Sequence, residues 1–113
     1  MLHHRPWGAY EVLIDEPTYK VKRIIILPHQ QLSLQYHKNR EEHWTVVNGS
    51  GTIRVGNETK KATVGSRWII QKEELHRATA QDENLVFVEV QLGDCTEEDI
   101  VRLEDQYGRI KEQ

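Results

Sequence analysis

Apolar residues in this chain recur mostly at every second position, in short segments bounded by turn residues, and this pattern limits the possible folds more than any other feature. Residues 19–27 are rich in β-branched side chains and end at Pro28. Successive side chains of a strand point to opposite faces, so this period is typical of half-buried strands. Similar segments follow at residues 32–37, 44–47, 52–55, 59–64, 67–70 and 85–92. Many short strands with regular turns predict an all-β sandwich or barrel.

Two local patterns add detail. Gly56-Asn57 separates two of the segments and predicts a tight hairpin turn. Near the C-terminus, Thr96 is followed by acidic residues, as at the start of a helix. Apolar residues then fall at helical spacing before Gly108: Ile100, Leu103 and Tyr107. We therefore expect a short C-terminal helical segment packed on the barrel.

The length of 113 residues corresponds to one domain. We expect an N-terminal arm over 1–18, a barrel over 19–93 and a tail over 94–113. The net charge of -3 disfavours a nucleic-acid partner, which would require a basic surface. No apolar run reaches the roughly 20 residues of a membrane span, and the N-terminus lacks an apolar signal region. The single Cys95 fits a reducing compartment, so we expect a cytoplasmic protein with no membrane partner.

Four polar side chains of this chain are candidates for one metal site. Gln35 and His37 are two residues apart on one segment and share a face. Glu42 shares a face with Trp44, so a buried Trp44 directs Glu42 inward as well. His76 follows much later, after a turn-like stretch. Two imidazoles, a carboxylate and an amide oxygen suit one divalent ion, with zinc favoured and cobalt, manganese, nickel or iron as alternatives.

Other interpretations of these residues stay open at this point. A single histidine is more often a hydrogen-bonded structural residue than a metal ligand. A register slip of one residue would direct His43 inward in place of Glu42, and Glu41 is another competitor. The remaining histidines have no supporting pattern and are expected at the surface: His3, His4 and His29.

The spacing of these residues resembles the two motifs of the cupin family. The first motif reads G-x5-H-x-H-x(3 or 4)-E-x6-G, and residues 29–49 keep its spacing, with His29 for the opening glycine and Gln35 for the first histidine. The second reads G-x5-P-x-G-x2-H-x3-N, and residues 65–80 retain Gly65 and His76 but carry Gln71, Glu73 and Ala80 at the other positions. The resemblance implies a double-stranded β-helix, or jelly-roll barrel. It also implies Gln35, His37, Glu42 and His76 as ligands.

A closer resemblance covers residues 5–109 and is to the C-terminal domain of type II mannose-6-phosphate isomerases. It is carried by segments that follow in order: Arg5-Pro6-Trp7-Gly8, Tyr19-Lys20-Val21-Lys22-Arg23, Leu32-Ser33-Leu34-Gln35, Glu42-His43-Trp44, Glu89-Val90-Gln91, Asp99-Ile100-Val101-Arg102 and Tyr107-Gly108-Arg109. Such domains are commonly fused to a mannose-1-phosphate guanylyltransferase. That part is absent from this sequence, so we expect a stand-alone domain that does not make GDP-mannose by itself.

This resemblance implies the interconversion of mannose 6-phosphate and fructose 6-phosphate. The reaction requires an electrophile, a base and cations for the phosphate. We expect the metal to be the electrophile and Glu89 to be the base if its face of strand 85–92 lines the barrel. The cationic candidates for the phosphate are Arg5, Lys22, Arg102 and Arg109, with Lys22 also a candidate for catalysis. A solvated surface position is the ordinary alternative for each of these cations.

Two other functions and one assembly remain to be considered. The chain could be a non-catalytic module that binds a sugar or sugar phosphate, or another metal-dependent cupin enzyme such as a dioxygenase. Gln35 in place of a histidine disfavours the dioxygenase. A homodimer is expected because small barrels have sheet edges to cover, and the segment around Trp7 and Tyr10 could supply that cover.

Overall fold

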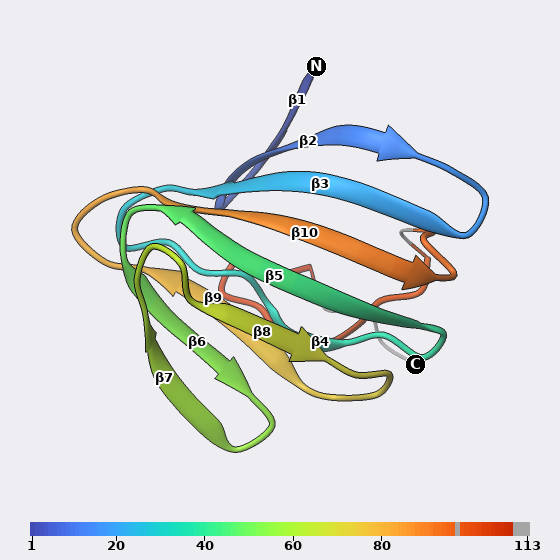
Figure 1. Ribbon diagram of the computed structural model, residues 1–113. Coiled ribbons are helices and arrows are strands. Elements are labelled where there is room, and N and C mark those ends of the chain that lie inside the picture. The colour runs from blue at the N-terminus through green and yellow to red at the C-terminus, as the bar shows by residue number, and fades with distance from the viewer. Residues whose placement is uncertain (97, 110–113) are drawn as a thin grey trace.

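The protein is described by a computed structural model over residues 1–96 and 98–109 and consists of two antiparallel sheets (Figure 1). The six-stranded sheet has, in spatial order, the strands β1 (Leu2–Arg5), β2 (Gly8–Asp15), β3 (Tyr19–Ile26), β10 (Leu85–Gly93), β5 (Arg40–Asn48) and β8 (Arg67–Ile70). The five-stranded sheet contains β11 (Val101–Glu104), β4 (Leu34–Tyr36), β9 (His76–Ala80), β6 (Gly51–Val55) and β7 (Glu58–Ala62).

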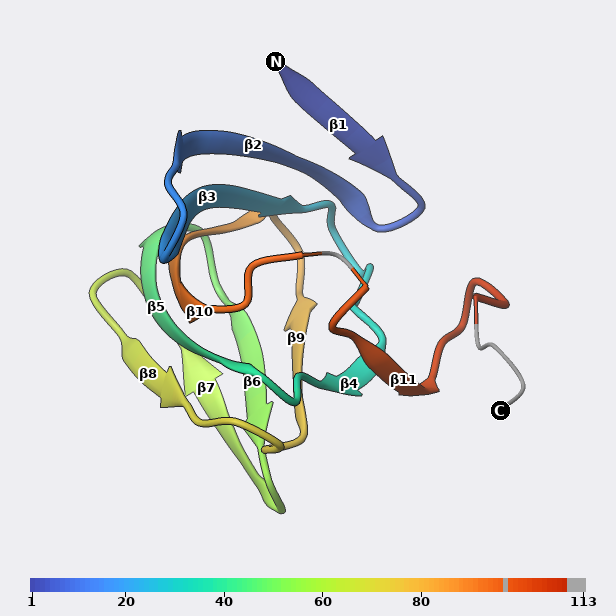
Figure 2. The same ribbon diagram turned by 90° about the vertical axis from the view of Figure 1, so that its right-hand side faces the viewer.

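The two sheets, seen end-on in Figure 2, enclose one apolar core. Every second side chain of β5 and of β10 is buried along most of each strand, as the two-residue period predicts. Trp44 and Phe87 come from these neighbouring strands and stack with 4.4 Å between ring centres. The all-β prediction is therefore confirmed. Residues 1–18, which we expected as an arm, contribute β1 and β2 to the larger sheet.

The predicted hairpin is confirmed, because Val55 pairs with Glu58 across Gly56-Asn57. Gly49, which closes the first motif, has a φ of 81°. A Cβ atom there would also collide with the carbonyl oxygen of Asn84. Only glycine therefore fits this turn without strain.

Two turns keep a left-handed backbone although the motif glycine is missing. His29 and Glu73 stand where the motifs have glycine, and their φ angles are 63° and 66°. A non-glycine residue in this region costs about 1–2 kcal/mol. The amide of Glu73 donates to the carbonyl oxygen of His37 over 2.7 Å, which holds the second motif's turn against the first motif.

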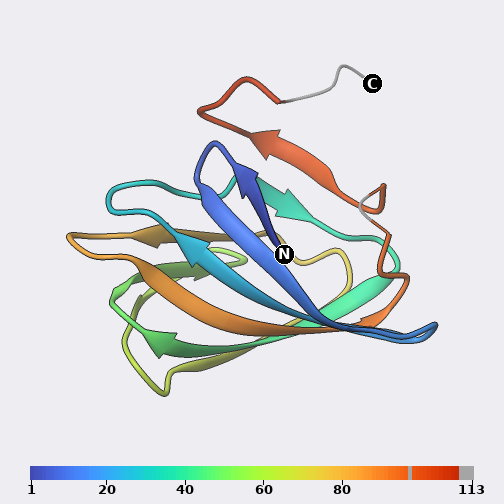
Figure 3. The same cartoon turned by 90° about the horizontal axis from the view of Figure 1, so that it is seen from above.

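The predicted C-terminal helix is wrong. Val101–Glu104 form β11, which pairs antiparallel with β4 (Figure 3), and no described residue is helical. Residue 97, within the expected first turn, lies outside the described residues. The physical reason is that a helix of about a dozen residues is marginal by itself, whereas β4 has an open edge whose backbone groups need partners.

No helix in the described part of the chain has the length and hydropathy to cross a membrane.

The outer face of the larger sheet exposes several apolar side chains: Ile14, Val47, Ile69 and Leu92. The homodimer stays a prediction.

Candidate metal and substrate site

Three of the four predicted metal ligands come together in the barrel interior. Glu42 lies on β5, His76 begins β9, and His37 lies in the connection between β4 and β5. One potential ligand atom from each lies within 4.8 Å of the others, and all three side chains are buried. The two imidazole rings have centres 5.2 Å apart. The folding of distant segments thus creates a His/Glu cluster that could hold an ion.

The ring of His37 presents a lone pair to this cluster. Its Nδ1 lies 2.5 Å from the carbonyl oxygen of Asp99, and because a carbonyl only accepts, Nδ1 carries the proton. The other nitrogen, Nε2, lies 3.2 Å from Oε2 of Glu42. Burial lowers the pKa of His37 to about 4, with Arg40 contributing further. The ring is therefore neutral at pH 7, and its contact with Glu42 is not an ion pair.

His76 is arranged in the same way and has an unsatisfied atom. Its Nδ1 donates to the carbonyl oxygen of Glu74 over 2.9 Å, so Nε2 carries the lone pair. This Nε2 is buried, has no hydrogen-bond partner among the described residues and lies 3.7 Å from Oε1 of Glu42. Burial lowers the pKa of His76, which keeps the ring neutral. An unpartnered imidazole lone pair beside a carboxylate fits a divalent ion, and Nδ1–H donation to a carbonyl is the usual support of a metal-binding histidine.

Arg40 also belongs to this site, although the sequence analysis did not identify it. It is buried, and its Nε donates to Oε2 of Glu42 over 2.9 Å. Its Nη2 lies 3.3 Å from Nε2 of His37. An imidazole nitrogen has one lone pair, so an ion bound to His37 would replace this contact with Arg40. The available signal was the two-residue spacing of Arg40, Glu42 and Trp44, which places Arg40 on the inward face.

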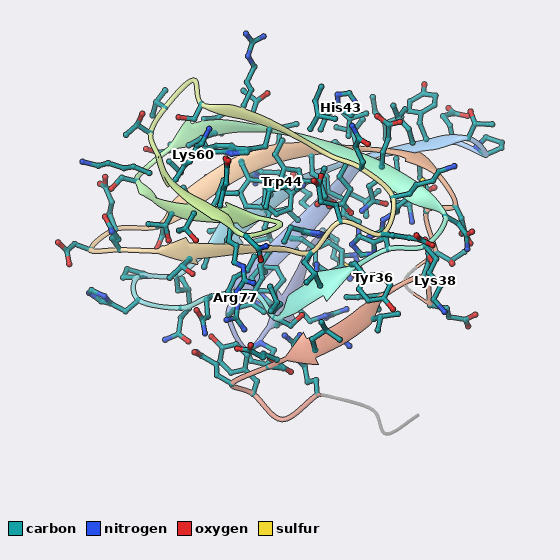
Figure 4. The ribbon with its side chains drawn as sticks, turned by 90° about the horizontal axis from the view of Figure 1, so that it is seen from below. Tyr36, Lys38, His43, Trp44, Lys60 and Arg77 are labelled. Carbon is teal, nitrogen blue, oxygen red and sulfur yellow. The ribbon has the colours of Figure 1, made fainter. Side chains whose placement is uncertain are left out.

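The alternative register of β5 is wrong. His43 lies on the outer side of the strand, while Trp44 lies between the sheets (Figure 4). His43 Nε2 contacts Oε2 of Glu41 at 2.7 Å, so both competing residues face away from the cluster. Gln35 is half-buried on β4 in register with His76, and its Oε1 accepts from Ser33 over 2.7 Å. A role for Gln35 as a ligand stays a prediction.

Glu89 points into the barrel, next to Glu42. The indole Nε1 of Trp44 lies 3.1 Å from Oε1 of Glu42 and 3.0 Å from Oε1 of Glu89, so one N–H bridges the two carboxyl groups. Gln91 donates to the other oxygen of Glu89 over 2.7 Å. Burial, together with the neighbouring Glu42, raises the pKa of Glu89 to about 7. A carboxyl group with this pKa can take up and release protons near neutral pH.

The buried Glu89 and His37 give opposite contributions to the pH dependence of stability. Glu89 ionises near pH 4.5 when unfolded but near 7 when folded, so its contribution falls as pH rises between these values. His37 gains a proton below about pH 6.5 when unfolded but only near 4 when folded, so its contribution falls as pH drops through this range. Each difference corresponds to about 3 kcal/mol.

His76, whose pKa burial also lowers, acts in the same direction as His37, so we expect the unfolding free energy of the metal-free protein to fall as pH drops from 6.5 to 4.5, with Glu89 opposing part of this fall. The Glu89→Gln protein lacks the group that opposes the two histidines, so its unfolding free energy should fall by about 2 kcal/mol more than that of wild type as pH drops from 6.5 to 4.5. Urea denaturation across this range measures both curves. Parallel profiles for the two proteins would contradict the burial of an ionisable Glu89.

All four predicted phosphate cations line one cavity together with the two carboxyl groups: Arg5, Lys22, Arg102, Arg109, Glu42 and Glu89. Lys22 is buried, and its Nζ lies 4.4 Å from the ring centre of Tyr10. Arg5 lies 5.1 Å from the same ring centre and donates to the Tyr10 hydroxyl over 3.1 Å. Arg109 differs, because its guanidinium binds Asp105 through two contacts of 2.7 and 3.1 Å.

The sequence of this chain is similar to part of several longer known proteins. A family model described as the C-terminal part of mannose-6-phosphate isomerase matches residues 1–105. The chain is 41% identical over 108 residues to the xanthan biosynthesis protein XanB of Xanthomonas campestris pv. campestris, which covers 94% of this chain and 23% of that protein. It is 39% identical over 111 residues to the alginate biosynthesis protein AlgA of Pseudomonas aeruginosa, with 96% and 23% covered. The chain thus spans about a quarter of the length of these relatives.

Solved structures show the fold. KdgF from Halomonas sp. superposes with a TM-score of 0.78 at 11% identity, over 87% of this chain and 89% of that one. A cupin-2 domain from Rhodospirillum rubrum has a TM-score of 0.73 at 18% identity, with 88% and 76% covered. Oxalate decarboxylase from Lactobacillus farciminis has a TM-score of 0.78 at 23% identity, with 91% and 33% covered. The predicted cupin barrel is therefore confirmed.

Proposed function

Because this chain belongs to the family of mannose-6-phosphate isomerase C-terminal domains, we propose that it interconverts mannose 6-phosphate and fructose 6-phosphate. One observation carries the proposal. The buried Glu89, whose pKa is about 7, shares a cavity with Glu42 of the His/Glu cluster and with cations suited to a phosphate. Base, electrophile site and anion site are the three parts that an aldose–ketose isomerisation needs.

Glu89 is the proposed base. Its carboxylate takes the proton from C2 of the open-chain mannose 6-phosphate and returns it to C1, while the hydroxyl proton moves from O2 to O1, which gives fructose 6-phosphate. Lys22 stands opposite Glu89 in the register of β3 and β10 and lines the same cavity, and its ammonium group is the proposed ligand of the sugar oxygens beside the transferred proton. Lys22 also favours the ionised form of Glu89, and thereby its action as a base.

His37, Glu42 and His76 are the residues that would hold a divalent ion, with zinc favoured, and Gln35 is the proposed fourth ligand. Such an ion would supply the electrophile that stabilises the negative charge on the sugar oxygen during proton transfer. The two neutral rings present their Nε2 lone pairs toward Glu42, so the site needs little rearrangement of its imidazoles.

The cavity cations are the proposed phosphate ligands, and Arg102 provides a test. The loss of one charge-assisted hydrogen bond costs about 1.5–3 kcal/mol, so Arg102→Gln should raise KM for mannose 6-phosphate by about 10- to 100-fold with a smaller change in kcat. Arg67→Gln, at an exposed arginine of β8, is the matched control and should leave KM unchanged. Arg109→Gln should have the smaller effect, because Asp105 already holds that guanidinium. An unchanged KM for Arg102→Gln would remove this residue from the phosphate site.

The experiment that tests the activity uses protein stripped with a chelator and reloaded separately with zinc, cobalt, manganese, nickel or ferrous iron. We expect metal-dependent formation of fructose 6-phosphate from mannose 6-phosphate, followed by an enzyme-coupled assay. Binding of the sugar phosphate without turnover under every metal would instead indicate a non-catalytic binding module.

A further inference from the structure

The segment between β10 and β11 runs across one end of the barrel (Figure 2) and brings Asp99 to the His37 loop. Asp99 is only 9% exposed. Its Oδ1 accepts from the amide of Lys38 over 3.0 Å, and its Oδ2 accepts from the amide of Asn39 over 2.9 Å. One carboxylate thus holds two consecutive amides of the loop that follows His37.

The backbone of Asp99 acts on the ring itself. Its carbonyl oxygen accepts from Nδ1 of His37 over 2.5 Å. This bond places the proton on Nδ1, leaves the lone pair on Nε2 and directs Nε2 toward Glu42. Asp99 therefore contacts three consecutive residues, 37–39.

We propose that Asp99 is a positioning residue for the metal site. Its carboxylate fixes the C-terminal segment on the loop, and this docking places its carbonyl oxygen where it orients His37. Affinity for a divalent ion then depends on a segment that holds no predicted ligand. The inference rests on the metal-binding part of the proposed function and does not require turnover.

The chain that follows Asp99 also lines the cavity. Ile100 and Arg102 follow Asp99 closely and line the same cavity as Glu42. Arg102 pairs with Gln35 in the register of β11 and β4. A loosened Asp99 therefore disturbs the orientation of His37 and the placement of Arg102 together.

The test compares Asp99→Ala and Asp99→Asn with a matched control, Asp94→Ala. Asp94 lies in the same segment, and its side chain also accepts from a backbone amide, that of Thr96. Its own contact with the loop, at the carbonyl oxygen of Asn39, is made by its backbone amide, which Asp94→Ala retains. The first measurement is the ring state of His37 in metal-free protein, by two-bond nitrogen–proton NMR. The second is zinc affinity, by competition with a chromogenic chelator. Urea denaturation identifies any variant that does not fold.

We expect wild-type His37 in the Nδ1–H form and a mixture of ring states in Asp99→Ala. Zinc affinity of Asp99→Ala should fall about 10- to 100-fold, as for other groups that orient metal ligands. Asp99→Asn retains one acceptor oxygen and should recover part of the loss. Asp94→Ala should match wild type in both measurements.

A loss of stability in Asp99→Ala with wild-type ring state and zinc affinity would overturn the proposal and reduce Asp99 to a turn cap. If Asp99→Ala does not fold, the Asp99→Asn protein decides by the same two measurements. If wild type itself binds no zinc, the proposed function fails, while the ring state of His37 still decides whether Asp99 positions it.

Discussion

Replacement of Glu42 by glutamine is expected to abolish metal binding and to lower isomerase activity by at least about a thousandfold. Glu42 supplies the only carboxylate of the His/Glu cluster found in the described residues, and each of its oxygens faces one imidazole. An amide of the same shape has no negative charge to attract a divalent ion. Elemental analysis of the reloaded protein and the isomerase assay measure the two effects.

The matched control for Glu42→Gln is Glu41→Gln. Glu41 is the adjacent residue on β5, but its carboxylate contacts His43 on the outer side of the sheet. It should keep full metal content and activity. Normal metal content in Glu42→Gln would refute the proposed ligand set.

The Glu42→Gln change also affects stability, because it removes the carboxylate that binds the buried Arg40. A broken buried pair costs about 3–5 kcal/mol, so folding must be checked by urea denaturation. His76→Gln separates the two effects. His76 has no contact with Arg40 in the hydrogen bonds of the described residues, and its Nε2 has no partner to lose. We expect this variant to fold and to bind metal weakly.

Replacement of Glu89 by glutamine is expected to lower kcat by about 10²- to 10⁴-fold and to leave metal content unchanged. Glutamine removes the proton-accepting group but retains an oxygen that can accept from the Trp44 indole. The Gln91 amide can rotate so that its Oε1, which has no hydrogen-bond partner among the described residues, accepts from the new amide at position 89. A lower kcat with unchanged metal content would show that Glu89 acts as the base and does not hold the metal.

The pH profile provides a second signature of Glu89. The base must be ionised to accept a proton, and its pKa is about 7, so wild-type kcat should rise with pH through about 7. The residual activity of Glu89→Gln should lack this rise. The same rise in both proteins would assign it to another group and would exclude Glu89 as the base.

The sequence by itself determined which side of each strand a residue occupies. Side chains alternate along a strand, so Glu42 shares a face with Trp44 and Glu89 shares a face with Phe87, and the structure then showed that both faces are buried. The family motifs added His37 and His76 through spacing alone. β9 was missed as a strand because its inward residues next to His76 are Ala78 and Ala80, whose small side chains give a weak apolar period.

The tertiary structure decided the rest, because it depends on which distant segments become neighbours. Alternation does not indicate that the C-terminal segment pairs with β4, so neither β11 nor the contact between Asp99 and His37 was predictable. The contact between Arg40 and Glu42 differs, because their two-residue spacing on β5 already places both side chains on one face. The pKa of about 7 at Glu89 likewise arises from burial and from a second carboxyl group 47 positions earlier in the chain, and only the fold creates both conditions.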